Sequence, residues 1–360
     1  MSDRLFAATR KGLFEFRRRG GAWGVERTSF LGSPVSAVLP DPRDGRLYVA
    51  LDLGHFGVKL HRSADGGASW SEVAAPSYGG VEAEGETAPS LALVWTLETA
   101  GPDRPGALWA GTIPGGLFYS EDGGERWSLN RGLWDTPERK QWFGGGYEKP
   151  GIHSVSLHPS DSRRIAVAIS TGGVWESTDG GESWRLGGKG LRAAYLPPDQ
   201  ANDQIHQDVH RLVRCRAAPD DFWIQHHNGV FRSTDGVQAW REITPATHPA
   251  FGFAVAVHPS RPDTAWFAPA VKDEFRYPKD GRLVVARTTD GGASFDLLGD
   301  GLPQKDCYDL VYRHGLEVDE TGERLAIGST TGGLWLSEDA GEAWIQAPAR
   351  LPPIYAVRWG

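Results

Sequence analysis

Apolar and polar residues alternate in short runs along most of the chain, and these runs come in groups of four. In the clearest group, residues 152–184, the runs read IHSVSLHP, RIAVAIS, GGVWES and SWRL, with Gly, Asp and Ser between them. Alternation of β-branched and aromatic residues between such breaks predicts short β-strands joined by turns. The groups extend over residues 34–74, 89–130, 152–187, 208–243, 251–298 and 308–346.

Each group carries one motif between its last two predicted strands, Ser-x-Asp-x-Gly-x-x-Trp or a close variant. Its aspartates stand 49 to 57 residues apart and are Asp65, Asp122, Asp179, Asp235, Asp290 and Asp339. Such a period indicates one structural unit repeated along the chain. We expect a tight turn in which the Asp carboxylate and the Ser hydroxyl bond to exposed backbone groups. The Trp is large enough to fill the space between neighbouring sheets.

The two ends of the chain together supply a seventh group. Residues 4–28 predict three strands, and residues 352–360 match the innermost strand of the other groups. Seven four-stranded antiparallel sheets, closed by the C-terminal strand joining the N-terminal sheet, make an all-β, seven-bladed β-propeller. Because the repeat is continuous, we expect residues 1–360 to form a single domain.

The repeated motif resembles the Asp-box, also called the bacterial neuraminidase repeat, and six copies make the resemblance specific. In that family the turn lies on the rim away from the active site, so the resemblance implies a structural role for the six aspartates. Sialidases share the motif, but they have six blades and bind the substrate carboxylate with three arginines, one in an Arg-Ile-Pro motif. Here Ile113-Pro114 follows Thr112, in the third blade. A sialidase or another glycosidase is therefore the less favoured interpretation.

Composition and charge argue against two classes of partner. The net charge of −8 disfavours nucleic acid, because non-specific binding to phosphates needs a basic surface. No apolar run approaches the roughly 20 residues needed to cross a bilayer. The first predicted strand begins close to Met1 without a signal-peptide pattern, so we expect a cytoplasmic protein. Two cysteines, Cys215 and Cys307, are too few for a disulfide framework.

Connection lengths distinguish the two faces of the predicted propeller. The Asp-box turns are short, whereas the opposite face carries long insertions at residues 75–90, 130–151, 188–208 and 268–281. Long loops inside a compact fold are usually functional. We therefore expect a ligand site on that face, over the axis.

Alignment of the innermost strands predicts which side chains surround the axis at this face. They are Tyr355, Ser36, Ser90, His153, His210, Phe253 and Asp309. With His206, His226 and His227 in neighbouring connections, five of the 11 histidines fall in one sector. Imidazoles on rigid strands are common metal ligands, so His153, His210 and His226 are candidate ligands of a divalent metal such as zinc or manganese. Two other interpretations stay open: histidines that bind the ligand directly, and polar side chains that line a water-filled channel.

The long loops add candidate binding side chains. Residues 130–151 contribute Trp142, Tyr147 and Glu148, and residues 188–208 contribute Tyr195 and Asp208. Exposed aromatic rings beside charges suit stacking on a sugar or anchoring of a partner protein, and a lid of mutually packed rings is the alternative. The predicted substrate-binding residues are Trp142, Arg276, Tyr277, Asp309, Tyr355 and His227. By contrast, His158, His258 and His314 are expected on the Asp-box side in structural roles.

Two further resemblances concern function. The chain is similar in architecture to seven-bladed lyases that act on uronate-containing sugars or lactones with axial histidines and a divalent metal. That similarity implies an acid or base among His206, Tyr147 and Glu148. A similarity to photosystem II assembly factors with Asp-box blades implies instead a non-catalytic scaffold for a protein partner. We predict a metal-assisted lyase or hydrolase acting on a small polar or sugar-like substrate, with the scaffold as the alternative.

Overall fold

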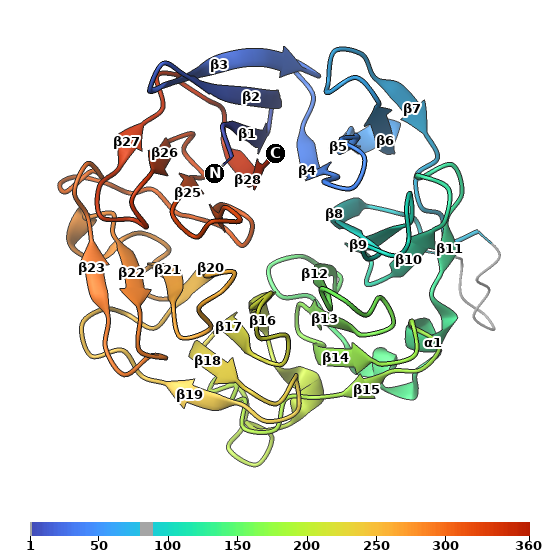
Figure 1. Cartoon of the computed structure of the whole chain (residues 1–360). Helices are drawn as coiled ribbons and strands as arrows, with labels where there is room; N and C mark the ends of the chain where they lie inside the picture. The colour runs from blue at the N-terminus through green and yellow to red at the C-terminus, as the bar shows by residue number, and fades with distance from the viewer. Residues whose placement is uncertain (1, 80–88) are drawn as a thin grey trace.

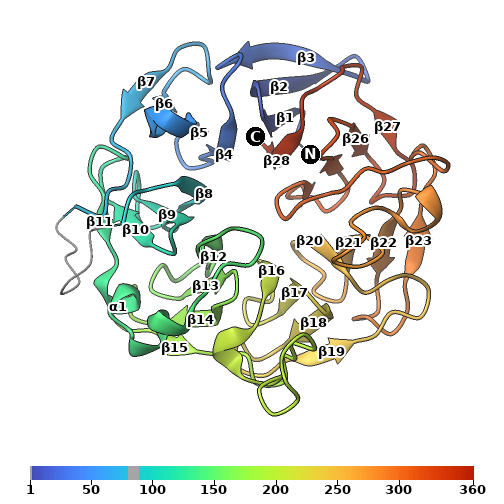
Figure 2. The ribbon, with the colours of Figure 1, turned by 180° about the vertical axis from the view of Figure 1, so that it is seen from behind.

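The computed structural model describes residues 2–79 and 89–360, and this part of the chain forms 28 β-strands and five short helices. The strands make seven four-stranded antiparallel sheets, the blades, arranged in a ring around a central axis (Figures 1 and 2). The prediction of a seven-bladed β-propeller is confirmed. The acidic run Glu82, Glu84 and Glu86 of the first insertion, which its charge predicts to be solvated, lies outside the described residues.

The four strands of each blade follow one another from the axis outward. Blade 1 contains β28 (Ile354–Trp359), β1 (Arg4–Thr9), β2 (Gly12–Arg19) and β3 (Ala22–Ser29). Blade 2 contains β4 (Val35–Pro40), β5 (Leu47–Asp52), β6 (Val58–Ser63) and β7 (Ser71–Val73). Blade 3 contains β8 (Leu93–Thr99), β9 (Leu108–Ile113), β10 (Leu117–Ser120) and β11 (Ser128–Leu129). Blade 4 contains β12 (Ile152–Leu157), β13 (Ile165–Ile169), β14 (Gly173–Ser177) and β15 (Arg185–Leu186).

The remaining blades have the same order. Blade 5 contains β16 (Val209–Arg214), β17 (Phe222–His226), β18 (Gly229–Ser233) and β19 (Arg241–Ile243). Blade 6 contains β20 (Gly252–Val257), β21 (Ala265–Pro269), β22 (Val285–Thr288) and β23 (Asp296–Leu298). Blade 7 contains β24 (Leu316–Val318), β25 (Leu325–Gly328), β26 (Leu334–Ser337) and β27 (Ile345–Gln346). The helices are η1 (Gly54–Phe56), α1 (Arg131–Trp134), η2 (Pro137–Gln141), η3 (Gln204–His206) and η4 (Lys279–Gly281).

The two ends of the chain close the ring as the sequence predicts. Strand β28 pairs antiparallel with β1, with Ala7 opposite Val357. Neighbouring blades pack through apolar clusters in which Trp175, Trp223 and Trp266 are fully buried. Because β28 covers the inner edge of β1, blade 1 has four strands like the other blades. Every helix within residues 2–79 and 89–360 is too short or too polar to cross a membrane.

The Asp-box turns use their carboxylates within the turn itself. In blade 4, Ser177 Oγ donates to Asp179 Oδ1 at 2.7 Å, and the same oxygen accepts from the Ser183 N–H at 3.0 Å. Gly181, at φ +93°, donates its N–H to Ser177 Oγ at 2.8 Å. The hydroxyl-to-carboxylate bond recurs in the other five turns. These aspartates therefore hold turns together, in agreement with the structural role that the motif predicts.

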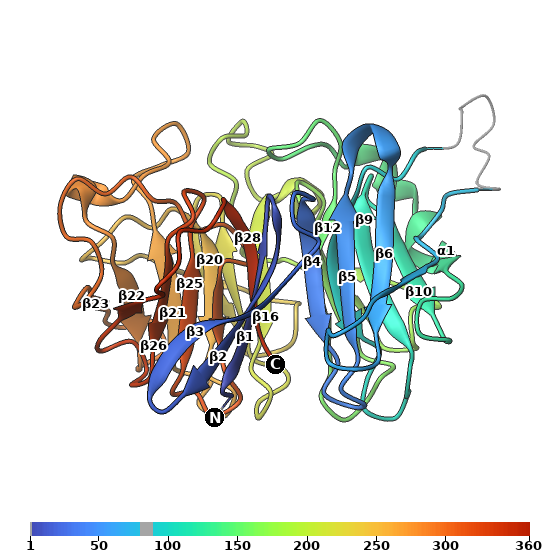
Figure 3. The same ribbon diagram turned by 90° about the horizontal axis from the view of Figure 1, so that it is seen from above.

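The two edges of the propeller differ in the length of the loops that they carry (Figure 3). Both chain ends lie at the edge that carries the Asp-box turns, where Arg4 donates to Gly66 O and Ser2 contacts Gly360 O. The long loops before β12 and β16 rise at the opposite edge, which we call the upper edge. The predicted separation of short turns from long insertions is thus visible in the fold.

A β-bulge interrupts the innermost strand of several blades at the same level near the upper edge. In blade 2, Val35 faces Leu51 and Ala37 faces Ala50, so Ser36 has no partner in the ladder. The registers skip one residue in four other blades, namely Trp95, His153, His210 and Tyr355, and two residues, Phe253 and Ala254, in blade 6. A bulge re-aims the side chain of the skipped residue, and here the skipped residues gather around the axis.

Candidate functional site

A cavity of about 550 Å³ lies over the axis at the upper edge. Its lining includes the loop of residues 143–147 and the turns after β5, β13 and β17, all of which belong to this edge. Five of the bulge residues line it, namely Ser36, Trp95, His210, Phe253 and Tyr355. The lining side chains that carry chemistry are Ser36, Asp52, Trp95, Tyr147, Thr171, Tyr195, Asp208, His210, His227, Phe253, Asp273, Arg276, Tyr312, Arg313, His314 and Tyr355.

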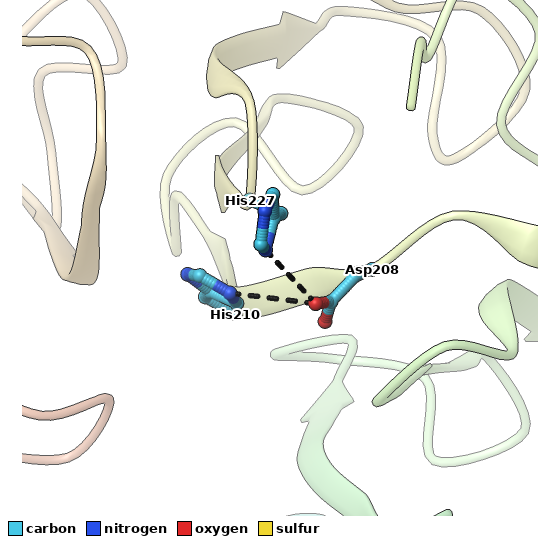
Figure 4. A group of neighbouring side chains, drawn as sticks. All are labelled: Asp208, His210 and His227. Atoms are coloured by element: carbon cyan, nitrogen blue, oxygen red, sulfur yellow. Dashed lines mark ion pairs between the residues drawn. The ribbon is translucent and has the colours of Figure 1, made fainter. Parts of the chain in front are cut away.

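Three side chains from blade 5 converge at one point of this cavity (Figure 4). Asp208 Oδ2 lies 3.6 Å from His210 Nε2 and 3.3 Å from His227 Nδ1. The Asp208 carboxyl is 7% exposed, and its other oxygen, Oδ1, is buried without a hydrogen-bond partner among the described residues. Gly145 brings the loop close above this carboxyl, since a side chain there would meet Asp208 Oδ1 and Thr171 Oγ1.

The orientation of His210 leaves a lone pair facing the carboxylate. Its Nδ1 lies 2.6 Å from Gly252 O, a carbonyl that can only accept, so Nδ1 carries the proton. Burial lowers the pKa of His210, which Asp208 only partly opposes, and the ring is neutral at pH 7. Burial alone would raise the pKa of Asp208, but His210 while protonated, and also His227 and Arg313, lower it well below its usual range, so the carboxylate is already ionised when His210 loses its proton. A neutral Nε2 and a carboxylate oxygen, both acceptors, therefore face each other.

The spacing of these atoms suits a metal ion. All three ligand atoms lie within 4.8 Å of one another. Two ligands of a tetrahedral ion, each bound at ~2.1 Å, stand about 3.4 Å apart. The observed 3.3 and 3.6 Å match that separation, whereas direct N–H···O bonds are usually shorter. Asp208, His210 and His227 could hold a divalent cation.

Of the three predicted metal ligands, the structure places only His210 in this group. His153 is fully buried behind Trp95, 5.4 Å between ring centroids, and its Nδ1 bonds with Ser154 Oγ at 2.9 Å. His226 accepts from the Asn228 N–H at 3.1 Å, and burial lowers its pKa to about 3. Both rings are fully buried, and neither lines the cavity. Asp208 and His227 stand in the sequence where a loop meets a strand, and that position was the available signal.

Blade 7 requires a correction to the predicted alignment. Its innermost strand begins at Leu316 and not near residue 308. The same backbone bond closes the turn after the innermost strand in both blades: the Asp41 N–H donates to Arg46 O in blade 2, and the Asp319 N–H donates to Arg324 O in blade 7. Ser36 lies five residues before Asp41, and His314 lies five residues before Asp319. The counterpart of Ser36 is therefore His314, which lines the upper cavity and bonds through Nε2 to His153 O at 2.8 Å. The expectation that His314 lies on the Asp-box side was wrong.

Two other predicted residues lie away from the axis, because the alignment placed the innermost strands of blades 7 and 3 five residues too early. Asp309 accepts from the hydroxyls of Ser329 and Thr331 in a loop of blade 7 and does not line the cavity. In blade 3, Trp95 takes the bulge position that the alignment assigned to Ser90, which is exposed before β8. His258 does have the expected structural place, stacked on Trp266 with 6.1 Å between ring centroids.

The loop residues divide into a lining set and an outer set. Tyr147, Arg276, Tyr355 and His227 line the cavity, and Tyr147 packs edge-on against Trp95 at 5.0 Å. Trp142 does not line it, because the indole is buried against Trp175 in the cluster between blades 3 and 4. It anchors the loop below the site.

Three further predicted residues lie in the outer set. Glu148 is exposed, and Tyr277 sits beside Tyr308 and Phe275 outside the lining. His206 Nδ1 lies 3.6 Å from Asp203 Oδ2, and its ring is 6.1 Å from that of Phe143. The cavity thus receives its chemistry both from strand residues such as His210 and Tyr355 and from loop residues such as Tyr147 and Asp208.

An arginine that the sequence did not single out lines the cavity. Arg313 is 8% exposed, and its guanidinium carbon lies 5.0 Å from the Trp95 ring centroid and 5.3 Å from that of Phe253. Its Nε is buried without a hydrogen-bond partner, and no carboxylate of residues 2–79 and 89–360 lies within 4.0 Å of it. Burial lowers the pKa of Arg313, and Asp208 and Tyr147 partly oppose this.

Comparison with known proteins supports the fold and suggests chemistry for relatives only. No protein-family model matches the chain. It is 26% identical over 240 residues to an oligoxyloglucan-reducing end-specific xyloglucanase of Emericella nidulans, a match that covers 62% of this chain and 28% of the enzyme. The chain therefore spans less than a third of the length of that relative.

Solved structures of similar fold include enzymes and a peptide-binding protein. An ancestral GH74 enzyme is 19% identical with a TM-score of 0.60, covering 84% of this chain and 36% of that one. The GH74 enzyme of Niastella koreensis is 17% identical with a TM-score of 0.59, covering 96% and 54%. YCF48 bound to a D1 peptide is 14% identical with a TM-score of 0.55, covering 94% and 88%. At these identities the likeness concerns the fold alone.

Proposed function

We propose that this propeller is a metal-dependent lyase or hydrolase that acts on a small polar, sugar-like substrate in the upper cavity. The observation that carries the proposal is the arrangement of Asp208, His210 and His227, in which a neutral imidazole nitrogen faces a buried carboxylate. A cation between them would satisfy both acceptors at once. A divalent metal with an open coordination position supplies Lewis acidity or an activated water.

The other side chains of the lining suit substrate binding and proton transfer. Of the predicted acids and bases, Tyr147 is the one that lines the cavity. Burial raises the pKa of its phenol, so the hydroxyl is protonated at neutral pH and can donate to a leaving group. Trp95 and Tyr355 offer ring faces, and Ser36 and Thr171 offer hydroxyls, for a hydroxylated carbon skeleton.

The test is a metal titration of purified, chelator-treated protein with zinc and manganese, followed by calorimetry. We expect one stoichiometric site. Asp208→Asn and His227→Gln should each weaken it on the order of 100-fold or more, because each removes a ligand from a three-residue set. His226→Gln, a buried histidine of the same blade outside the group, is the matched control and should bind the metal normally. Equal affinity in all four proteins would remove the metal site.

A glycosidase without a metal is the second candidate, and the xyloglucanase match favours it. Asp52 and Asp208 both line the cavity, and glycosidases use a pair of carboxylates flanking the scissile bond. One assay distinguishes the two candidates: the cleavage of oligosaccharide substrates is measured in the presence of chelator. Chelator-resistant cleavage that Asp52→Asn abolishes would support the glycosidase. Saturable binding of a peptide without turnover or metal would instead support a scaffold.

A further inference from the structure

The geometry points to a ligand that carries a carboxylate, bound by Arg313 together with Arg276. This inference names the substrate class of the upper cavity and rests on that cavity being the ligand site of the proposed function. It concerns binding, and it does not depend on which bond is broken.

The first argument is that Arg313 has no hydrogen-bonded or ion-paired partner among the described residues, although the charge of Asp208 favours its charged form from a longer distance. Three arginines of the described residues are less than 9% exposed, namely Arg214, Arg313 and Arg324. Arg324 pairs with Asp3 at 2.8 Å, and Arg214 donates to Pro219 O at 2.9 Å and to Ser156 Oγ at 3.3 Å. Arg313 alone of the three contacts only aromatic faces. A buried guanidinium without an acceptor is costly, and an anion supplied from the cavity would satisfy it.

The second argument is the position of Arg276 on the same ring. The guanidinium carbons of Arg276 and Arg313 lie 5.4 and 5.3 Å from the Phe253 centroid. His210 stacks on one face of Phe253 at 4.3 Å with an interplanar angle of 16°. Arg276 contributes to the lowered pKa of Arg313, as like charges do. Arg276 is itself paired with Asp273, whose Oδ1 accepts from Arg276 Nε at 3.0 Å, so Arg276 has the supporting role and Arg313 would make the main contact with a ligand anion.

The third argument selects a carboxylate over other anions. A planar guanidinium binds a carboxylate through two parallel N–H···O bonds. Asp52, Asp208 and Asp273 also line the cavity, and their negative charges disfavour a doubly charged phosphate more than a singly charged carboxylate. Phe253 contacts both Arg313 and His210, so a carboxylate bound to Arg313 would lie in the same cavity as the Asp208 group. A sugar acid fits these demands.

The experiment compares glucuronate, galacturonate and gluconate with glucose and with inorganic phosphate, by calorimetry, on chelator-treated and metal-loaded protein. We expect at least one acid to bind more than tenfold tighter than glucose, as charge-assisted bonds predict. Arg313→Met should weaken the acid by a factor on the order of ten to a hundred and leave glucose unchanged, while Arg313→Lys restores part of the affinity. Arg282→Met, an exposed arginine six positions from Arg276, is the control and should match the wild type.

Several outcomes would overturn the inference: acids that bind no better than glucose or not at all at millimolar concentration, phosphate that binds better than every acid, or full affinity in a folded Arg313→Met protein. The two proposals fail separately. Arg313-dependent acid binding without a metal would remove the metal-dependent function and keep the carboxylate site. Metal binding without acid selectivity would do the reverse.

Discussion

The two cavities at the ends of the propeller axis, here called the upper and lower mouths, differ in whether their charged side chains are paired within the fold. The lower mouth, at the Asp-box edge, has a volume of about 790 Å³, larger than the upper one of about 550 Å³. There Arg358 donates to Glu98 at 2.7 Å and to Glu317 at 3.1 Å. Burial alone would lower the pKa of Arg358, but these two carboxylates raise it. In the upper mouth, Arg313 and one oxygen of Asp208 lack such partners.

This difference shows why cavity size is a poor guide to function. Charges that are paired within the fold hold strands together, and they have little left to offer a ligand. The lower mouth also contains Arg211, with one hydrogen bond of 3.5 Å to His153 O, and Arg214, whose Nη2 lacks a partner, so unpaired arginine atoms alone do not distinguish the two. The upper mouth differs in that an unpaired carboxylate oxygen, Asp208 Oδ1, lies there beside His210 and His227. Unsatisfied groups in a cleft are the stronger indication of a binding site. The smaller cavity is therefore the functional candidate.

The largest expected effect is a loss of stability at the lower mouth. Arg358→Met leaves the half-buried Glu98 and Glu317, whose side chains are 25% and 24% exposed, without their cation, which should cost about 1.5 to 3 kcal/mol of unfolding free energy. Denaturant unfolding measures it. The control is Arg46→Met, which breaks the exposed pair with Asp44 and should cost less than about 1 kcal/mol. An Arg358→Met protein as stable as the wild type would erase the distinction between the two mouths.

We expect acid to lower the unfolding free energy through protonation of buried histidines near the upper mouth. Burial lowers the pKa of His153, His210, His226 and His314 below the ordinary value of 6.5, for His226 to about 3. The unfolded chain takes up these protons first, so stability is present above pH 6.5 and falls as the pH drops toward the folded-state values. Each such histidine contributes a slope of about 1.4 kcal/mol per pH unit within its window.

His226→Gln tests this slope at one position. Between pH 6.5 and pH 4.5 the unfolding free energy of the variant should fall less than that of the wild type, and the difference should be close to the effect of one bound proton. Denaturant unfolding of metal-free protein measures it. His55→Gln, at an exposed position, should leave the slope unchanged. An unaltered slope in the His226 variant would mean that this ring takes up its proton in the folded state as readily as in the unfolded chain.

The seven blades, the ring closure and the two unequal edges were predictable because each rests on a repeated local signal. Strand alternation and the Asp-box recur often enough that one worn copy, such as the turn at Arg17–Gly21, does no harm. The position of a side chain around the axis has no such redundancy. Residues 308–313 alternate like a strand, yet Leu310 and Tyr312 pack on Phe251 and Phe253 as part of a loop.

That shift in blade 7 explains why the sequence prediction misplaced Asp309 and His314 and missed Arg313. A strand that starts at residue 308 puts Asp309 at the axis, whereas the true start brings Arg313 and His314 there. The pairing of Asp208 with His210 and His227 could not be predicted either, because it depends on a bulge and on a tight turn after β17. Loop aromatics were ambiguous for the opposite reason: Trp142 and Tyr147, five residues apart, point into the core and into the cavity respectively.

The smallest expected effect is at the upper mouth, and it sharpens the comparison most. Arg313→Met removes a buried cation and its contacts with Trp95 and Phe253, but it leaves no ion-paired carboxylate without its partner. The lost cation–π contacts, about 1 kcal/mol each, oppose the gain from not burying a charge, so unfolding free energy should stay within about 1 kcal/mol of the wild type. Denaturant unfolding beside Arg358→Met measures the contrast. A loss as large as that of Arg358→Met would mean that Arg313 is already satisfied within the fold, and its charge would then be structural at both mouths.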